Sequence, residues 1–468
     1  MHNSALDQHL DAWLLRRPGG LTAVRFQTHT VLAEVRRCLR LALPLIGAQV
    51  VSMGNGLVDA LVAGQLGPES LAAGGIAAAL WFFAALFCIG MMAGLSPVMS
   101  RRVGERRRNE LGVVFRQGLW LAVLTGVFAT LFLQLVMHYL PASTLQPELV
   151  PLILEYLFVA CWSLPFFALV MAARNLCEAV GLAKPVLFVQ LIGLLVNTVA
   201  NLAFGLGWFG APKLGLTGIG LSTTLVMICM SLVLMLMLRG SKFDRYALFA
   251  QFDWPHWQEL NVIIRLAVPI TLGLVFEAGL FVATTIQMGM LGTHEAAGHY
   301  IAMGATSVCY MLPLGLSFAV TARVGRSDGR QLRESVRLRI FSAMIIVGFM
   351  AVSTALILLL FRYPITALYT NDLSLRHFAA SLLLMAAVFQ LPDAAQVVLS
   401  GVLRGLHDTK VPMLINGFSY WVIAFGIGLF ATYRLDYGAY GLWIGLISGL
   451  TVASVLLSLR LRWILRQH

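Results

Sequence analysis

Twelve long apolar runs constrain the fold of this chain more than any other feature of its sequence. About 20 apolar residues are enough for a helix to cross the roughly 30 Å hydrocarbon layer of a membrane. The runs lie at 41–66, 70–99, 111–138, 148–173, 185–207, 214–238, 266–291, 295–322, 340–361, 377–403, 411–433 and 439–459. Lipid offers the backbone no hydrogen-bond partner, so segments of this length must be helical. The sequence therefore predicts an all-α integral membrane protein with twelve transmembrane helices.

The composition excludes a soluble enzyme. Hydrophobic residues make up 59% of the chain and charged residues only 12%, whereas a typical soluble protein carries about 25% charge. A membrane enzyme would need a cluster of His, Cys or carboxylate residues, and the sequence contains no such cluster. The six cysteines are scattered without a CxxC pair, so no disulfide framework or zinc site is predicted. We expect neither catalysis nor an organic cofactor.

The basic residues predict the orientation in the membrane. With the N-terminus in the cytoplasm, all but four of the 33 Lys and Arg residues fall on the cytoplasmic side, which is where loops carry excess positive charge. The four exceptions are Lys213, Arg362, Arg376 and Arg434. We therefore expect cytoplasmic N- and C-termini in a bacterial-type inner membrane. This asymmetry also accounts for the net charge of +12, so we expect contact with membrane lipids and no nucleic-acid partner.

The chain contains an internal duplication. A shift of 225 positions lays the first apolar run on the seventh without a gap, and Pro44, Gly54 and Gly64 then meet Pro269, Gly279 and Gly289. Nearly the same shift matches Arg102-Val103-Gly104 with Arg323-Val324-Gly325, and Gly215 and Gly218 with Gly438 and Gly441. Each half holds six spans, so both halves enter the membrane from the same side. This predicts two six-helix bundles related by a parallel internal repeat, with a pseudo-two-fold axis along the membrane normal.

The duplication predicts the domain organisation. Residues 1–36 are expected to form a cytoplasmic tail, and residues 37–239 the six-helix N-lobe. The polar stretch 240–260 is expected to be a cytoplasmic loop that connects the lobes, and residues 261–468 the C-lobe with a short cytoplasmic tail. Two bundles related in this way leave a cleft that can open to either side by rocking, which favours a transporter.

Three acidic residues lie well inside the apolar runs: Asp59, Glu277 and Asp393. A charge at the bilayer centre costs about 3 kcal/mol or more, so such residues are functional candidates. At 1.5 Å per residue, Glu277 and Asp393 are expected roughly 16 to 18 Å from the inner boundary, counted from Arg265 and Arg404. A buried acid pair can hold a proton or bind Na⁺ and release it when another cation enters. Pro392 directly precedes Asp393, and a kink there would free a backbone carbonyl beside the carboxylate.

Polar and aromatic residues on other spans complete the candidate site. Asn197 and Asn201 lie one helical turn apart on one face, and with Thr223 they are candidate partners of Asp59. Such an Asn pair can instead serve as packing between helices. Gln49 and Phe389 are candidates for lining the cleft, where an aromatic ring can contact a cationic ligand.

Several segments resemble the multidrug and toxic compound extrusion (MATE) family, in its NorM-like branch. They are Leu43-Pro44 through Gly56-Leu57-Val58-Asp59, Phe276-Glu277, Arg174-Asn175-Leu176-Cys177-Glu178, Asn197 with Asn201, and Gln390-Leu391-Pro392-Asp393 through Arg404-Gly405. The resemblance implies export of cationic or amphipathic organic compounds in exchange for Na⁺ or H⁺. It implies that Glu277 and Asp393 form a coupling site in the C-lobe, and that Asp59 with the two asparagines forms a cation or proton site in the N-lobe.

The chain departs from the family pattern at one position. Sodium-using relatives often carry a Tyr one turn before the acid of the tenth span, and this chain has Phe389 there. The identity of the coupling ion, Na⁺ or H⁺, is therefore left open. The expected partners are small organic cations, and the expected oligomeric state is a monomer. A related alternative is a flippase for lipid-linked oligosaccharides or a carrier of polar metabolites, which would need buried Arg or Lys. An alternative of another class is a channel or receptor-like protein without coupled transport.

The arginine distribution yields a test of topology. A reporter enzyme fused after Arg330 should be active in the cytoplasm, and one fused at Asp372 should be active outside it, because only this orientation places the basic loops inside. Activity outside the membrane for the Arg330 fusion would contradict the twelve-span arrangement.

Overall fold

The computed structural model describes residues 28–142 and 146–467, and every secondary-structure element in these two ranges is a helix. The predicted tail at 1–27 lies outside the described residues. The first half contains α2 (Thr28–Leu66), α3 (Pro68–Ala93), α4 (Leu95–Gly104), α5 (Arg108–Tyr139), α6 (Leu149–Ala160), α7 (Ser163–Val180), α8 (Lys184–Ala200) and α9 (Leu216–Leu238). The second half contains α10 (Trp257–Leu291), α11 (Thr293–Gly329), α12 (Arg333–Leu360), α13 (Arg362–Ala367), α14 (Leu373–Gly405), α15 (Lys410–Phe418), α16 (Phe425–Tyr433) and α17 (Ala439–Gln467).

Short segments of other helix types join these elements. Three are 3₁₀ turns: η1 (Leu140–Ala142), η3 (Trp208–Gly210) and η4 (Asp244–Tyr246). Two are π-helical: η2 (Asn201–Gly205), which continues α8, and η5 (Ser419–Ala424), which joins α15 to α16. Such π turns are rare and occur often at functional sites. Both lie in the fifth span of their half of the chain.

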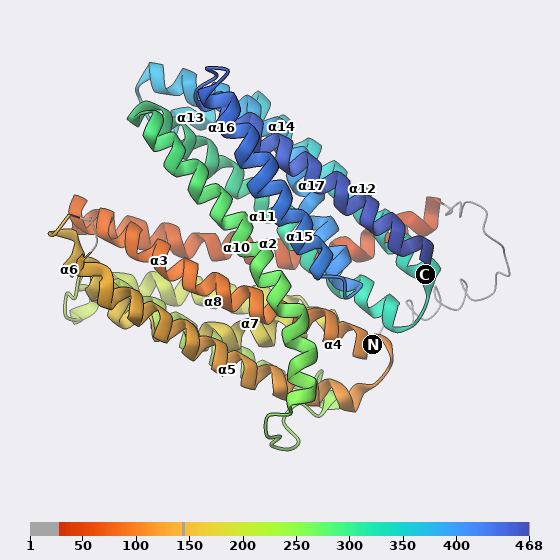
Figure 1. The fold of residues 1–468 in the computed structure, drawn as a ribbon. Helices are drawn as coiled ribbons and strands as arrows, with labels where there is room; N and C mark the ends of the chain where they lie inside the picture. The colour runs from red at the N-terminus through yellow and green to blue at the C-terminus, as the bar shows by residue number, and fades with distance from the viewer. Residues whose placement is uncertain (1–27, 143–145, 468) are drawn as a thin grey trace. The chain divides into compact units, whose positions relative to one another are not determined.

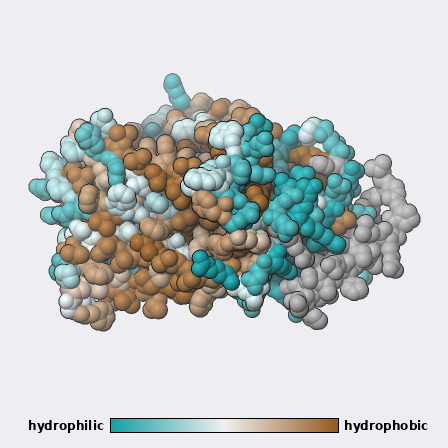
Figure 2. Space-filling model, turned by 90° about the horizontal axis from the view of Figure 1, so that it is seen from below, coloured by the Kyte–Doolittle hydropathy of each residue, from teal (hydrophilic) through white to brown (hydrophobic). Residues whose placement is uncertain are grey.

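The predicted set of twelve spans is confirmed, because twelve helical stretches in the described ranges are long and apolar enough to cross a membrane. Several boundaries differ from the prediction. The first helix begins at Thr28 rather than near 41, α10 begins at Trp257 rather than 266, and the fourth predicted span is divided into α6 and α7 at Cys161 and Trp162. Large apolar side chains such as Phe158 and Phe349 are exposed, and Figure 2 shows wide hydrophobic patches on one face of the molecule. Such a surface is stable only against lipid or a partner.

The duplication is visible in the backbone. Gly215 and Gly438, which precede α9 and α17, have φ angles of 62° and 53°. Only glycine adopts this region without steric cost. The repeat pairs these two positions, so the halves share a positive φ angle at this point as well as a sequence pattern.

By their contacts, the described residues form two compact units. Unit 1 comprises 28–43, 100–106 and 276–467, and unit 2 comprises 44–99 and 107–275. Two long helices therefore pass from one unit to the other: α2 after Leu43, and α10 after Val275. The two units are defined by contacts, whereas the N-lobe and C-lobe were defined by the sequence repeat. The division into lobes stays a prediction.

Each unit is a bundle of packed helices. In unit 1, α14 packs against α11, α12 and α17, and the core contains Leu382, Tyr420 and Trp443 (Figure 1). In unit 2, α3, α5 and α7 pack against one another, and α9 packs against α6, α7 and α8. Of the acidic candidates, Asp393 lies on α14 in the bundle of unit 1, whereas Asp59 and Glu277 lie on α2 and α10.

Close packing between α17 and its neighbours yields a test of the fold. A Cβ atom at Gly445 would approach the Gly428 Cα to 2.5 Å and would also meet the Ala424 carbonyl oxygen. We expect Gly445→Ala to destabilise the protein by about 1–3 kcal/mol, as overpacking typically does, measured as thermal unfolding in detergent. Gly426→Ala is the matched control, because a Cβ there has no neighbour within 4 Å. Equal stability of the two variants would contradict this packing.

Candidate functional site

Asp59 lies at the centre of a polar cluster in unit 2. The side-chain amides of Asn197 and Asn201 both donate to its Oδ1, at 3.0 and 2.7 Å. The two asparagines are a turn apart at the junction of α8 with η2, as their spacing predicted. The structure therefore brings together the three residues that the sequence placed in one site.

The Asp59 cluster presents several oxygen atoms. The Oδ1 atoms of Asn197 and Asn201 are buried and have no hydrogen-bond partner among the described residues. Buried polar groups are rarely left unpaired, so an unpaired acceptor marks a place where a cation, a proton or water can bind. Together with the Asp59 carboxylate, these atoms form an oxygen set suited to a hard cation or a proton.

Thr223 lies at the edge of the Asp59 cluster. Its hydroxyl donates to the Ile219 carbonyl in its own helix, and it lies 3.5 Å from the hydroxyl of Tyr156 on α6. Tyr156 is buried and close enough to Asp59 for the carboxylate charge to act on it. Thr223 thus contacts the Asp59 cluster through Tyr156, a residue that the sequence did not single out.

A second acidic cluster lies in unit 1, around Glu277 on α10. The hydroxyl of Tyr310, on α11, donates to Glu277 Oε1 at 3.1 Å. Asp393, on α14, is only 2% exposed and is close enough to Glu277 for their charges to interact. The predicted pairing of these two acids on different helices agrees with this geometry.

Tyrosine hydroxyls complete the second cluster. Tyr420, in the π turn η5, is fully buried and lies within electrostatic range of Glu277, Asp393 and Tyr310. At the C-terminal end of α14, Arg404 is near enough to act on Glu277 and Tyr310. Four oxygen-bearing side chains from four elements therefore lie within electrostatic range of one another, with one arginine nearby.

Asp393 follows a proline inside a long helix. α14 runs from Leu373 to Gly405 with Pro392 inside it, and the kink expected there stays a prediction. Proline has no N–H, so the Val388 carbonyl still lacks its partner within the helix. Phe389 is buried against Phe281 and Trp443, with ring centroids at 6.3 and 5.8 Å. It packs in the core of unit 1 rather than lining an open surface.

Gln49 lies apart from the Asp59 cluster. Its Oε1 accepts a hydrogen bond from Arg174 Nη1 at 2.8 Å. Arg174 in turn forms a 2.8 Å ion pair with Glu178, whose side chain is almost fully buried in α7. The structure therefore places Gln49, a candidate for lining the cleft, beside this ion pair.

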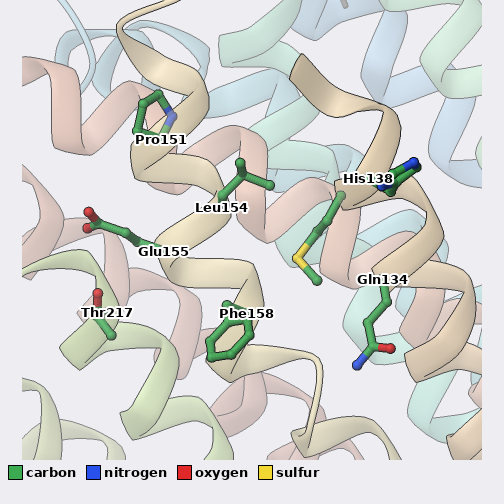
Figure 3. Close-up of a pocket in the computed structure, with 8 residues that line it drawn as sticks. Gln134, His138, Pro151, Leu154, Glu155, Phe158 and Thr217 are labelled. Carbon is green, nitrogen blue, oxygen red and sulfur yellow. The ribbon is translucent and has the colours of Figure 1, made fainter. Parts of the chain in front are cut away.

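A surface pocket in unit 2 lies between α5, α6 and α9. It is lined by Gln134, Met137, His138, Pro151, Leu154, Glu155, Phe158 and Thr217. In Figure 3, Leu154 points to the side of α6 that faces α5, whereas Glu155 points to the opposite side, toward Thr217. None of these eight residues belongs to the two acidic clusters. In the described ranges, no group of three or more His, Cys, Asp or Glu residues is placed to hold a metal ion.

Sequence reasoning missed the three tyrosines of the clusters: Tyr156, Tyr310 and Tyr420. Tyrosines are common in membrane helices, so residue type alone gave no signal. Tyr310 could have been found from its place in the eighth span at a depth close to that of Glu277. Tyr420 could not, because the π turn that positions it leaves no mark in the hydrophobic pattern.

The fold and the two acidic clusters define a class: a duplicated, twelve-span transporter with ionisable groups inside the membrane. The MatE family model matches the chain twice, at residues 44–203 and 269–430, once in each half. The chain belongs to the MATE family, as its sequence predicted.

Curated relatives match over almost their full length. A probable multidrug resistance protein NorM of Xylella fastidiosa is 37% identical over 94% of both chains. The multidrug resistance protein NorM of Aliivibrio fischeri is 32% identical over 94% of this chain and 96% of its own, and MdtK of Yersinia pestis is 34% identical over 93% and 97%.

Solved structures share the fold at low identity. A eukaryotic MATE transporter matches with a TM-score of 0.85 at 19% identity, over 92% of this chain and 96% of its own. An outward-facing multidrug resistance MATE transporter gives 0.85 at 22% identity, over 95% and 99%. A MOP-superfamily transporter from Pyrococcus furiosus, described as having a binding pocket of reverse polarity, gives 0.84 at 22% identity, over 94% and 99%. These likenesses show that the fold is shared at low sequence identity.

Proposed function

We propose that this protein is a secondary active antiporter. It exports cationic or amphipathic organic compounds in exchange for Na⁺ or H⁺, by rocker-switch alternating access. The observation that carries the proposal is the Glu277–Asp393 pair, two carboxylates on separate membrane-spanning helices with the Tyr310 hydroxyl bound to one of them. The names of the NorM and MdtK relatives, which are multidrug resistance proteins, support the same substrate class.

The oxygen sets of both clusters suit exchange between an ion and an organic cation. A carboxylate in a low-dielectric site is favourable only with a proton or a bound cation, so binding of one cation competes with binding of the other. In unit 1, Glu277 and Asp393 offer carboxylate oxygens, and Tyr310 and Tyr420 offer hydroxyls. The hydroxyls of these two tyrosines compensate for the missing tyrosine at Phe389, so Na⁺ and H⁺ both remain candidate coupling ions.

The distribution of buried arginines favours cationic over pyrophosphate-bearing substrates. The arginines that are less than 10% exposed each lie within salt-bridge distance of a carboxylate: Arg116 with Asp253, Arg174 with Glu178, and Arg323 and Arg339 with Glu34. Their charge is already compensated within the protein. A flippase for lipid-linked oligosaccharides would need uncompensated positive charge for its substrate.

Several expectations accompany the proposed function. We expect a monomer in a bacterial inner membrane with both termini in the cytoplasm, in contact with lipids, without catalytic activity and without a cofactor apart from the coupling ion. Asp59 with its two asparagines would serve as a second cation or proton site, on the N-lobe.

The proposal is tested by flux in proteoliposomes with ethidium as the organic cation. A Na⁺ gradient and a pH gradient are imposed separately, and at least one should drive ethidium against its own gradient. Ethidium flux that follows only its own gradient would contradict antiport and favour a channel. Response to one gradient alone identifies the coupling ion.

The acid pair yields a prediction within the same assay. Glu277→Gln, Asp393→Asn and the double variant should each lower gradient-driven flux by about tenfold or more, and the double variant should be little worse than either single one. The reason is that the two carboxylates titrate or bind an ion as a unit. Glu155→Gln is the control, because Glu155 is exposed on α6 outside both clusters. Two partial losses that simply add would show that the acids act separately.

The N-lobe cluster yields another prediction. Asp59→Asn keeps the shape and an acceptor for the amides of Asn197 and Asn201 but removes the charge. We expect folded, membrane-inserted protein with gradient-driven flux reduced by about tenfold or more. Drug resistance of cells that express this variant, compared at equal expression, is the second measurement. Unchanged resistance would indicate that the Asp59 cluster serves only in packing between helices.

A further inference from the structure

A buried ionic cluster joins three helices of unit 1 away from the acidic sites. Glu34, near the start of α2, is only 2% exposed. Arg323 on α11 donates to its Oε1 from Nε at 3.1 Å and also from Nη2. Arg339 on α12 places its Nε 3.7 Å from the same oxygen, and its Nη1 donates to the Arg323 carbonyl at 2.6 Å. One carboxylate therefore holds two guanidinium groups from two neighbouring helices.

The position of Glu34 in α2 gives the cluster its significance. α2 is an unbroken helix from Thr28 to Leu66, but its residues up to 43 belong to unit 1 and its residues from 44 to unit 2. Glu34 attaches the first part of α2 to unit 1, and Asp59, on the second part, belongs to the ion site of unit 2. Any movement of one unit relative to the other must therefore strain α2 or release its first part.

The repeat-related helix is attached differently. α10 also changes unit, after Val275, and its first part packs in unit 2 through small residues. A Cβ at Gly90 would approach the Thr271 Cα to 2.6 Å, and one at Gly94 would approach the Ala267 Cβ to 2.8 Å. Glu259, the repeat counterpart of Glu34, is partly exposed and forms no ion pair with another described residue. The ionic attachment is thus specific to α2.

We propose that Glu34, Arg323 and Arg339 form an ionic latch that opens in each transport cycle to release the first part of α2 from unit 1. This inference rests on the proposed alternating access and names the residues that control it. Removing one partner leaves buried charge uncompensated, so loss of Glu34 should weaken the closed latch strongly. Glu34 contacts neither acidic site, so it acts as a positioning residue for α2.

The accessibility of the native cysteine Cys38 to thiol reagents can be used to measure opening of the latch. It follows Glu34 by one turn, is 3% exposed and lies within electrostatic range of all three latch residues. The arginines on either side, Arg36 and Arg40, are exposed, so a released Cys38 would meet water-soluble reagents. A chain that keeps Cys38 as its one thiol is made by replacing Cys88, Cys161, Cys177, Cys229 and Cys309 with Ala.

The experiment measures the rate at which a cationic methanethiosulfonate reagent labels Cys38 in proteoliposomes. Glu34→Gln should raise this rate by about tenfold or more, because it increases the population in which the first part of α2 is released. Glu34→Asp, which keeps the carboxylate, should label closer to the unsubstituted rate. Glu259→Gln is the matched control at the repeat-related position and should leave the rate unchanged.

Two outcomes would overturn the latch. One is an unchanged rate in Glu34→Gln. The other is faster labelling of both Cys38 and Cys88 in single-cysteine chains that carry Glu34→Gln. Cys88 is fully buried on α3 in unit 2, so its labelling would indicate general unfolding. The labelling assay does not depend on transport. Ethidium flux that is independent of both gradients would contradict the proposed antiport, whereas the labelling rates alone test the latch.

Discussion

The structure depends on one constraint: inside hydrocarbon, a polar group must find its partner within the protein. At the two acidic clusters, neighbouring side chains supply these partners. Asp59 accepts from two amides, and Glu277 accepts from Tyr310. The helix α8, which carries Asn197, packs closely against α9 at Gly193, where a Cβ atom would approach Met230 Sδ to 2.5 Å. The acidic clusters are therefore precise because the surrounding apolar packing is tight.

Much of the fold could be predicted because its signals are periodic and long. The twelve spans and the duplication follow from apolar runs and from matched Pro and Gly residues, and the Asp59–Asn197–Asn201 cluster follows from helical spacing. Contacts between helices far apart in the sequence could not be predicted. Gln49 pairs with Arg174, and Glu34 pairs with Arg323, because their helices cross at these residues. Residue type and spacing along the chain do not reveal where two helices cross.

The two halves share backbone features at matching positions but differ in their polar side chains. Gly215 and Gly438 share a left-handed backbone, and the fifth span of each half carries a π turn that bears a residue of the adjacent cluster. At the position that repeats Asp59, Thr284 bonds only to its own helix. Under the proposed antiport, one half would bind a cation through an acid and two amides, and the other through two acids and tyrosines, on a shared scaffold.

The helices that change unit are also the helices that carry ionisable candidates. Glu277 lies two residues beyond the point where α10 passes into unit 1, and α2 carries Glu34 before its crossing and Asp59 after it. A ligand shifts a conformational equilibrium only if its binding free energy differs between the two states. An ion bound at Asp59 or Glu277 acts directly on a helix whose two parts belong to different units, so its binding energy is sensitive to how those units move. Under the proposed antiport, this placement couples ion exchange to movement without any further connecting element.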